Sequence, residues 1–310
     1  MGQVVVETKD LTKNYGDFTA VNKLNLTIEE GDIFGFLGPN GAGKTTTILM
    51  LLGLSEPSSG NATVCGFSPS RDPLKVKHIV GYLPERVGFY GYLTASQNLM
   101  YTADLNGLHK DEAHKDIIEL LDLVGLSEVG DKPVSAFSQG MKQRLGIADI
   151  LIKKPKLVFL DEPTSGIDPN GITEILNLIV KMAKQKISVI FCSHQLNHVQ
   201  KICTRVGILA RGQLVAEGPI DRLGKQSMGP ELYQIEVQVE ETDDKLINLI
   251  RQIKGVTGVT ASTDSLLVSC DKDLRPQIAK TIVESGKSLI GIKVEEFSLE
   301  KIYKKFSRGV

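Results

Sequence analysis

One short stretch combines the residue types that hold phosphate groups. The sequence reads GPNGAGKTT from Gly38 to Thr46 and matches the pattern G-x-x-x-x-G-K-[ST]. Glycines let the backbone turn tightly and aim its N–H groups at phosphate oxygens. Lys44 would reach the outer phosphates, and the hydroxyl of Thr45 suits Mg²⁺. An apolar run on each side disfavours a chance glycine-rich turn. We therefore expect a phosphate-binding loop made of Gly38, Pro39, Asn40, Gly41, Ala42, Gly43, Lys44, Thr45 and Thr46.

Two carboxylates follow an apolar run in KLVFLDEP, residues 156–163. A buried strand there would deliver Asp161 and Glu162 to its carboxyl end, where ligands bind in open parallel sheets. Asp161 suits Mg²⁺, directly or through water. Glu162 suits the general base that positions and deprotonates an attacking water. The alternative is an acidic strand end at a solvated turn, which the presence of the phosphate loop disfavours.

A second candidate for anion binding is the start of an expected helix in FSQGMKQRL, residues 137–145. A helix N-terminus offers unpaired N–H groups and a partial positive charge. Ser138 and Gly140 lie at this start. The alternative, which the residues alone leave open, is that Ser138 simply caps the helix.

The elements that must position these groups follow from hydrophobic patterning. Short apolar runs bounded by Gly, Pro or polar residues are typical of strands buried on both faces of a mostly parallel sheet. Helical spacing recurs between them, as in HKDIIELLDLVG at residues 114–125, so an α/β fold is expected up to about residue 220. The expected strands are DIFGFLGP (32–39), KLVFLDEP (156–163), ISVIFCSH (187–194) and RVGILARG (205–212).

The composition changes at DRLGKQSMGPEL, residues 221–232, which we predict to be a linker. The segment beyond it alternates strand-like and helix-like patterns in the order β-α-β-β-α-β, followed by a last helix in SLEKIYKKF. This order is that of a ferredoxin-like α+β domain. The predicted domains are therefore residues 1–222 and 223–310.

Bulk properties exclude several classes of protein. A hydrophobic fraction of 41% with 24% charged residues is that of a globular chain. The net charge of −1 gives no basic excess of the kind that nucleic-acid binding usually needs. The cysteines lack metal-site spacing, and we expect small buried residues in a reducing compartment. No apolar run approaches the ~18 residues of a membrane span, and no secretory signal is visible.

The order and spacing of five motifs resemble the ATPase subunit of ABC transporters. They are the phosphate loop, FSQGMKQRL, LVFLDEP, SGID and FCSH, and the resemblance covers residues 3 to about 220. It implies a P-loop NTPase core of the ABC ATPase type, with a helical subdomain at about residues 86–155. It also implies ATP and Mg²⁺ as ligands.

The resemblance assigns further residues. In this family two chains enclose ATP head to tail, so Ser138, Gln139 and Gly140 would contact the nucleotide held by the other chain. Tyr15 matches the aromatic residue that stacks on adenine. His194 matches the switch histidine that contacts the γ-phosphate, and Asp168 matches the acidic residue of the loop that links the two sites.

Two departures from the family pattern stand out. The signature Leu-Ser-Gly-Gly-Gln is Phe-Ser-Gln-Gly-Met here, which keeps the serine and the second glycine. The loop that senses the membrane partner usually carries Gln, and Glu85 occupies that position. A carboxylate there can hold Mg²⁺ or water but cannot donate a hydrogen bond when ionised. We therefore expect Glu85 to belong to the catalytic and metal site. The sequence leaves open whether this carboxylate permits full hydrolysis.

The function that these features imply is ATP hydrolysis driving a separate transmembrane permease. We expect a homodimer of this ATPase on the cytoplasmic face of the membrane, and no nucleic-acid partner. The segment after Glu85 would help to form the groove for a cytoplasmic helix of the permease. Phe89, Tyr90 and Tyr92 are the candidate contacts, with packing in the core as the alternative.

The branch that the sequence resembles includes antibiotic and multidrug exporters, sodium-export ATPases and the ATPase of nitrous oxide reductase maturation. GYLPERVGFYGYLT, residues 81–94, most resembles the last of these. Two alternatives remain open: a sensor or assembly module with little hydrolysis, suggested by Glu85, and a soluble ABC ATPase. The second usually has two ATPase units or long coiled coils, and neither is visible here.

Overall fold

The structure, a computed structural model, describes residues 3–228, 233–261, 265–295 and 299–307. The chain divides into two compact units. The first consists of Met1–Pro219 together with Phe306–Val310, and the second of Ile220–Lys305. Each unit has its own hydrophobic core, and the two units are described separately below.

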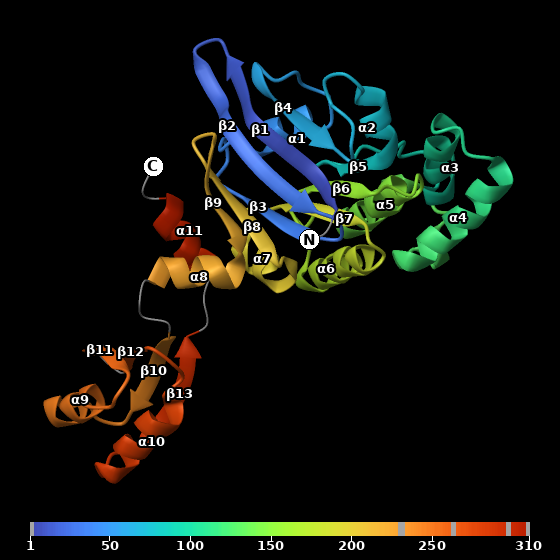
Figure 1. Ribbon diagram of the computed structural model, residues 1–310. Helices are drawn as coiled ribbons and strands as arrows, with labels where there is room; N and C mark the ends of the chain where they lie inside the picture. The colour runs from blue at the N-terminus through green and yellow to red at the C-terminus, as the bar shows by residue number, and fades with distance from the viewer. Residues whose placement is uncertain (1–2, 229–232, 262–264, 296–298, 308–310) are drawn as a thin grey trace. The chain divides into compact units, whose positions relative to one another are not determined.

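A six-stranded sheet forms the centre of the first unit, with the strand order β5-β6-β7-β3-β8-β9 (Figure 1). All neighbouring strands are parallel except the last pair, β8 and β9. The predicted mostly parallel sheet is therefore confirmed. Its strands are β3 (Ile33–Leu37), β5 (Val80–Leu83), β6 (Leu157–Asp161), β7 (Ser188–Cys192), β8 (Arg205–Ala210) and β9 (Gln213–Pro219).

The sheet is covered on both faces, which explains why its strands are nearly continuous apolar runs. Every residue of β3, β6 and β7 is buried. Phe34 and Phe36 share one face of β3 and belong to the main core cluster. Between them, a Cβ on Gly35 would approach Val199 of α7 (Leu196–Ile202) to 2.5 Å on the other face. A larger residue at position 35 would push that helix off the sheet.

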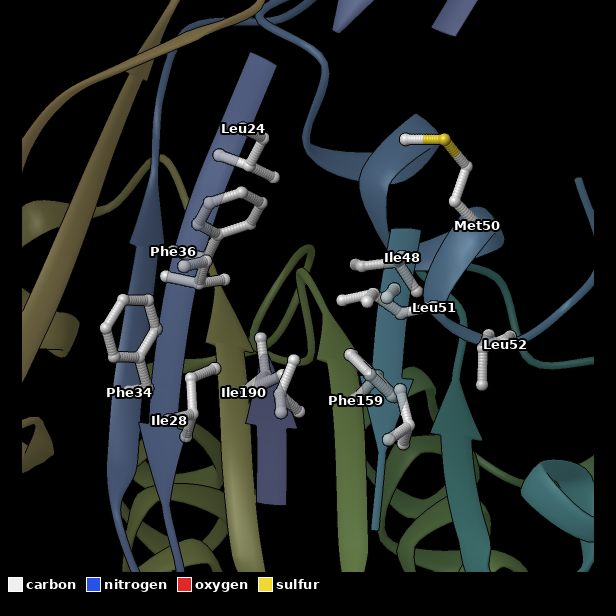
Figure 2. Packing of buried hydrophobic residues seen from close by; sticks show 14 of the residues in the cluster. Leu24, Ile28, Phe34, Phe36, Ile48, Met50, Leu51, Leu52, Phe159 and Ile190 are labelled. Atoms are coloured by element: carbon white, nitrogen blue, oxygen red, sulfur yellow. The ribbon is translucent and has the colours of Figure 1, made fainter. Parts of the chain in front are cut away.

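A second, antiparallel sheet of the first unit lies over helix α1, with the strand order β2-β1-β4. Figure 2 shows Leu24 and Ile28 of β2 and Ile48 and Leu51 of α1 in the same apolar layer as Phe36. The helix that follows the phosphate loop is therefore packed between two sheets. The elements are β1 (Val4–Tyr15), β2 (Phe18–Glu29), β4 (Ser59–Val64) and α1 (Lys44–Leu51).

Helices α3, α4 and α5 pack against one another and form a helical region within the predicted range 86–155. The last of them also packs closely on the edge of the large sheet, since a Cβ on Gly146 would lie 2.5 Å from Leu83 of β5. The remaining helices of this unit are α2 (Pro73–Ile79), α3 (Ala95–Leu105), α4 (Lys110–Leu123), α5 (Gln139–Leu151), α6 (Pro169–Lys184) and α7 (Leu196–Ile202), with short 3₁₀ turns at Ser127–Val129 and Val134–Ala136.

The second unit contains a four-stranded antiparallel sheet with the order β11-β12-β10-β13. Two helices lie between its strands along the chain, in the order β-α-β-β-α-β that the sequence predicts. Its core includes Ile235, Val237, Ile250 and Ile278. The elements from residue 220 onward are α8 (Ile220–Met228), β10 (Tyr233–Val239), α9 (Asp244–Arg251), β11 (Val256–Ala261), β12 (Leu266–Cys270), α10 (Arg275–Glu284), β13 (Leu289–Glu295) and α11 (Leu299–Ser307), and the last residues of α11 count with the first unit.

The predicted linker at residues 221–232 is wrong for its first part, because Ile220–Met228 form helix α8. Ile220 and Leu223 lie one helical turn apart and are both buried, so an apolar stripe outweighs the Gly and Ser that suggested a loop. Residues 229–232 of that segment lie outside the described residues.

The cysteines form no disulfide, and three of them are buried as expected, whereas Cys65 is half-buried. In the part of the chain that the structure describes, no helix combines the length and apolarity of a membrane span.

Candidate functional site

The phosphate-loop residues, 38–46, connect β3 to the start of α1 as the motif predicts. Helix α1 begins at Lys44 without a side-chain cap and without an acidic residue in its first turn. Its first N–H groups have no partner within the helix, which leaves them available to an anion. Gly43 has φ +104°, and a Cβ there would lie 2.5 Å from the carbonyl oxygen of Ala20 in β2. Only glycine fits this close approach.

Lys44 is buried, and its amino group turns back into the loop. The Nζ atom donates to the carbonyl oxygens of Gly38, at 2.7 Å, and Pro39, at 3.2 Å. The positive charge therefore sits in the concave face of the loop. Together with the uncapped helix start, this arrangement fits the phosphates of a nucleotide.

The Mg²⁺ ligands expected from the sequence meet at one point. The Thr45 hydroxyl donates to Asp161 Oδ2 at 3.2 Å, joining residues from α1 and β6. Burial raises the pKa of Asp161, and the hydrogen bond from Thr45 partly opposes this. A hydroxyl and a carboxylate are the hard oxygen ligands that Mg²⁺ prefers. The described residues contain no cluster of three His, Cys, Asp or Glu side chains that could cage a metal, so this pair fits an ion completed by phosphate oxygens and water.

Glu162 follows Asp161 directly, and its carboxylate is held by three donors. Oε1 accepts the backbone N–H of His194 at 2.8 Å and lies 2.9 Å from His194 Nδ1. Oε2 accepts the Ser193 hydroxyl at 3.3 Å. The side chain of Glu162 is 11% exposed, whereas that of His194 is 56% exposed. The carboxylate is thus fixed in orientation beside an accessible imidazole.

The backbone at Glu162 is also unusual, because its φ is +50°. This left-handed conformation is rare for a residue with a side chain. Hydrogen bonds maintain it: the Glu162 N–H donates to Cys192 O at 2.9 Å, and its carbonyl accepts from Ser165 N at 3.1 Å. Strained residues of this kind cluster at functional sites.

Glu85 lies just beyond β5 and is exposed. Its backbone carbonyl accepts from Gln143 Nε2 of α5 at 3.1 Å. Its negative charge is one of the causes that raise the pKa of Asp161, although the smallest of those resolved. The two carboxylates are therefore close enough to interact, and the assignment of Glu85 as a metal ligand stays a prediction.

Tyr15 ends β1 and pairs in register with Phe18 of β2 across the hairpin. The two residues are 51% and 63% exposed, and Lys13 Nζ lies 5.0 Å from the Tyr15 ring centre. The paired strand β2 also carries Ala20, which contacts the loop at Gly43. An exposed ring on this hairpin is suitably placed to stack on a base.

Ser138 caps helix α5, since its Oγ accepts from Met141 N at 3.2 Å. The first turn of α5 carries no acidic residue, and Ser138 and Gln139 are exposed. A Cβ on Gly140 would lie 3.4 Å from Ile167, next to Asp168. Asp168 in turn caps α6 by accepting from Gly171 N at 3.3 Å. Capping by Ser138 is therefore confirmed, whereas its contact with a nucleotide held by another chain stays a prediction.

The structure adds residues that the sequence patterns did not single out. Ser193, the residue before His194, orients the Glu162 carboxylate. Gln143 is fully buried and holds the Glu85 segment through its side chain. The position of Ser193 in FCSH was a possible signal for its role, whereas nothing in the local pattern distinguishes Gln143.

The aromatic residues after Glu85 divide between surface and interior. Tyr90 and Tyr92 are 45% and 77% exposed, whereas Phe89 is half-buried. Phe89 and Tyr90 line a hollow of about 400 Å³ together with Tyr101 of α3. Core packing is therefore wrong for Tyr90 and Tyr92.

Many known proteins are similar to this chain. The family model described as ABC transporter matches residues 21–165. The bacitracin transport ATP-binding protein BcrA of Bacillus licheniformis is 39% identical over 98% of both chains. The linearmycin resistance ATP-binding protein LnrL of Bacillus subtilis (strain 168) is 32% identical over 96% of this chain and 97% of its own.

Solved structures match about 70% of the chain. One described as the ATP binding subunit of an ABC transporter has a TM-score of 0.66 and 28% identity, covering 72% of this chain and 92% of that one. Another, cbiO1 from Clostridium perfringens, part of the ABC transporter complex cbiONQ, has a TM-score of 0.64 and 30% identity, covering 70% of this chain and 89% of that one.

Proposed function

Because the chain belongs to the family of ABC transporter ATP-binding subunits, we propose that it hydrolyses ATP to drive an exporter of the antibiotic or multidrug type. The transmembrane permease is a separate protein in this proposal. The observation that carries it is the meeting of three strand ends. β3 leads into the phosphate loop, β6 delivers Asp161 and Glu162, and β7 leads to His194.

Each strand end has a distinct task in hydrolysis. The uncapped start of α1 and Lys44 bind the phosphates. Thr45 and Asp161 would hold Mg²⁺, which supplies positive charge that offsets the charge developing on the phosphates. Glu162 accepts a proton from the attacking water, and the donors at His194 and Ser193 keep its carboxylate aimed. His194, more exposed than Glu162, is the residue that can reach the terminal phosphate.

Two chains complete the site in this proposal. The exposed start of α5 carries Ser138, Gln139 and Gly140, and its first turn has no acidic residue to repel an anion. A partner chain turned head to tail would present this helix start to the terminal phosphate. Ser138→Arg should still bind ATP as a monomer, because the phosphate loop is intact, but should fail to dimerise with ATP in light scattering. A normal ATP-dependent dimer would refute the shared site.

The exporter type rests on the relatives. The similar proteins named for bacitracin transport and linearmycin resistance match nearly the whole chain. We therefore favour the export of an antibiotic or another drug over the maturation of nitrous oxide reductase, which the segment at residues 81–94 alone suggested.

The main alternative is a module that binds ATP and hydrolyses it little, and Glu85 is its only support. The side chain is exposed and lies near enough to raise the pKa of Asp161. Glu85→Gln tests it directly. A large rise in turnover would favour the low-hydrolysis alternative, whereas equal or lower turnover would remove it.

The decisive experiment is a co-purification from solubilised native membranes. Tagged Glu162→Gln protein is incubated with ATP, and bound proteins are identified by mass spectrometry. Lys44→Ala, which should bind ATP more weakly, is the control at an ATP concentration between the two dissociation constants. A polytopic membrane protein in equal amount would support the transport function. An ATP-dependent dimer alone, with no membrane protein, would contradict it.

A further inference from the structure

A second histidine, four residues beyond His194, contacts the turn that begins at Glu162. His198 lies on α7, and its Nδ1 atom stands 3.2 Å from the hydroxyl oxygen of Thr164. Thr164 belongs to the segment at residues 162–165, which we call the Glu162 turn. Thr164 and His198 both fall outside the five motifs of the sequence, since LVFLDEP ends at residue 163, SGID begins at 165 and FCSH ends at 194. The contact therefore joins α7 to the Glu162 turn at a point that no motif includes.

The hydroxyl of Thr164 needs a partner because it is buried. Thr164 is 1% exposed, and buried polar side-chain atoms are nearly always hydrogen-bonded. The Nδ1 atom of His198 supplies that partner. Losing it would leave a hydroxyl inside the protein without water, which is unfavourable. The Thr164–His198 contact thus fixes the middle of the Glu162 turn from a neighbouring helix.

The imidazole of His198 is suited to a contact between neutral groups. The ring is half-buried, and burial is the main cause that lowers the pKa of His198. The charges of Lys201 and His194 add to this effect, whereas that of Glu162 opposes it. The lowered pKa keeps the ring uncharged near neutral pH. An uncharged imidazole has one N–H donor and one acceptor nitrogen, and a hydroxyl can pair with either.

Glu162 is held by its side chain and by its backbone, and different segments hold the two. Ser193 and His194, which follow β7, donate to the carboxylate. The backbone has a φ of +50°, a conformation that persists only where the surroundings maintain it. Within the turn, the N–H of Ser165 donates to the Glu162 carbonyl at 3.1 Å. The contact at Thr164 restrains the same turn from α7, so it acts on the backbone that carries the carboxylate.

We propose that His198 is a positioning residue for hydrolysis, which acts through Thr164 to hold the Glu162 turn so that the carboxylate meets the attacking water. This inference rests on the proposed function, because it deepens the role given there to Glu162. A displacement of about 1 Å in a reacting group can lower a rate by about 10²-fold. Ser193 and His194 would still hold the carboxylate without His198, so we expect a smaller loss, of about tenfold in kcat.

A double-mutant cycle separates positioning from support of the fold. His198→Leu and Thr164→Val should each lower kcat by about tenfold and leave ATP affinity unchanged, because the phosphate contacts come from residues 38–46. The double variant should lose no more than either single variant, since both changes remove the same contact. Its melting temperature should return toward that of the unmodified chain, because the buried hydroxyl and its partner are then both gone. A contact that only supported the fold would regain kcat together with the melting temperature.

Two further variants sharpen the cycle. His198→Asn can place an oxygen or an amide nitrogen near the position of Nδ1, and should keep kcat within about threefold of the unmodified chain. The matched control His109→Leu removes an exposed histidine that makes no cap hydrogen bond at the start of α4, and should change neither kcat nor affinity. Normal kcat in His198→Leu, additive losses in the double variant, or no rescue by Asn would overturn the inference and leave the proposed function standing.

The contact can also be tested without turnover, by NMR of the full chain labelled with ¹⁵N in its histidine rings. The resonances of His194 and His198 are assigned by replacing each in turn. Thr164→Val should shift the Nδ1 resonance of His198. His198→Leu should shift that of His194, whose Nδ1 lies 2.9 Å from Glu162 Oε1 and therefore reports where the carboxylate stands. An unchanged resonance at either position would overturn the inference. If the unmodified chain hydrolyses no ATP, the proposed function fails, and these two resonances alone decide whether His198 holds the Glu162 turn.

Discussion

Glu162→Gln separates the role of the carboxylate charge from its role in the fold. The substitution keeps the size and shape of the side chain. A Gln oxygen in the place of Oε1 can still accept the His194 N–H now found at 2.8 Å. The new amide group in the place of Oε2 would face the Ser193 hydroxyl, which can turn to accept a hydrogen bond. We therefore expect a change in stability of no more than about 1 kcal/mol.

Hydrolysis should change far more than stability. An amide cannot take a proton from water, and a general base contributes about 10²- to 10⁴-fold. The expected fall in kcat corresponds to about 2.7–5.4 kcal/mol in the activation barrier. Affinity for ATP should hold, because the phosphate contacts come from the loop at residues 38–46 and not from Glu162.

The assay is phosphate release at saturating ATP, with ATP affinity and melting temperature measured on the same preparation. Glu128→Gln, an exposed glutamate in the 3₁₀ turn at Ser127–Val129, is the matched control and should behave as the unmodified chain. If Glu162→Gln turns over within about threefold of the unmodified chain while remaining folded, the proton acceptor lies elsewhere and the reasoning is wrong.

Three further substitutions test other parts of the structure. Lys44→Ala should lower ATP affinity by at least about tenfold, or 1.4 kcal/mol, because it removes the charge inside the loop; unchanged affinity in calorimetry would contradict this. Tyr15→Ala should weaken ATP binding by about tenfold if stacking contributes about 1–3 kcal/mol, and Tyr15→Phe should not; equal affinities for both variants would remove the stacking role. Asp149→Asn should melt higher than the unmodified chain near neutral pH. Because burial raises the pKa of Asp149 above 3.8, the native state binds more protons than the unfolded state in the window just above that value, so stability falls as pH rises through it. The gap between the two proteins should therefore widen from acidic to neutral pH, and a lower melting temperature for Asp149→Asn at neutral pH would show that the carboxylate supports the fold.

The parts of the site that the sequence predicted are those encoded in consecutive residues. The phosphate loop follows from its own spacing, and β6 carries Asp161 and Glu162 together, so the period of the strand was enough to place them. The contact of Thr45 with Asp161 agrees with the shared role as Mg²⁺ ligands that the sequence patterns predict for both residues. These segments could be assigned to one site because their order along the chain matches a known family pattern. No single segment indicates this by itself.

Other features depend on packing between distant segments and left no local signal. Gln143 holds the Glu85 segment across 58 positions of the chain. Asp149, whose buried Oδ1 has no hydrogen-bond partner among the described residues, lies on α5, which packs against α3 and β5. Nothing in the local sequence distinguishes this residue from other polar residues of a half-buried helix. Helix α8 was predicted as a linker for the same reason. Its composition is typical of a loop, but the burial of Ile220 and Leu223 favours a helix.

Helix α5 has a consequence for how signals pass through the protein. It begins beside Ser138, carries Gln143 in its middle, and presents Asp149 in its last turn. At 1.5 Å a residue, the two ends stand roughly 16 Å apart on one continuous rod. If each end binds a different partner, helix α5 fixes both the distance and the relative angle between the two partners. One extra residue inserted within it would rotate one end by roughly 100° about the axis relative to the other. Each end could then still bind its own partner, but the two partners would no longer have the relative orientation that the intact helix sets.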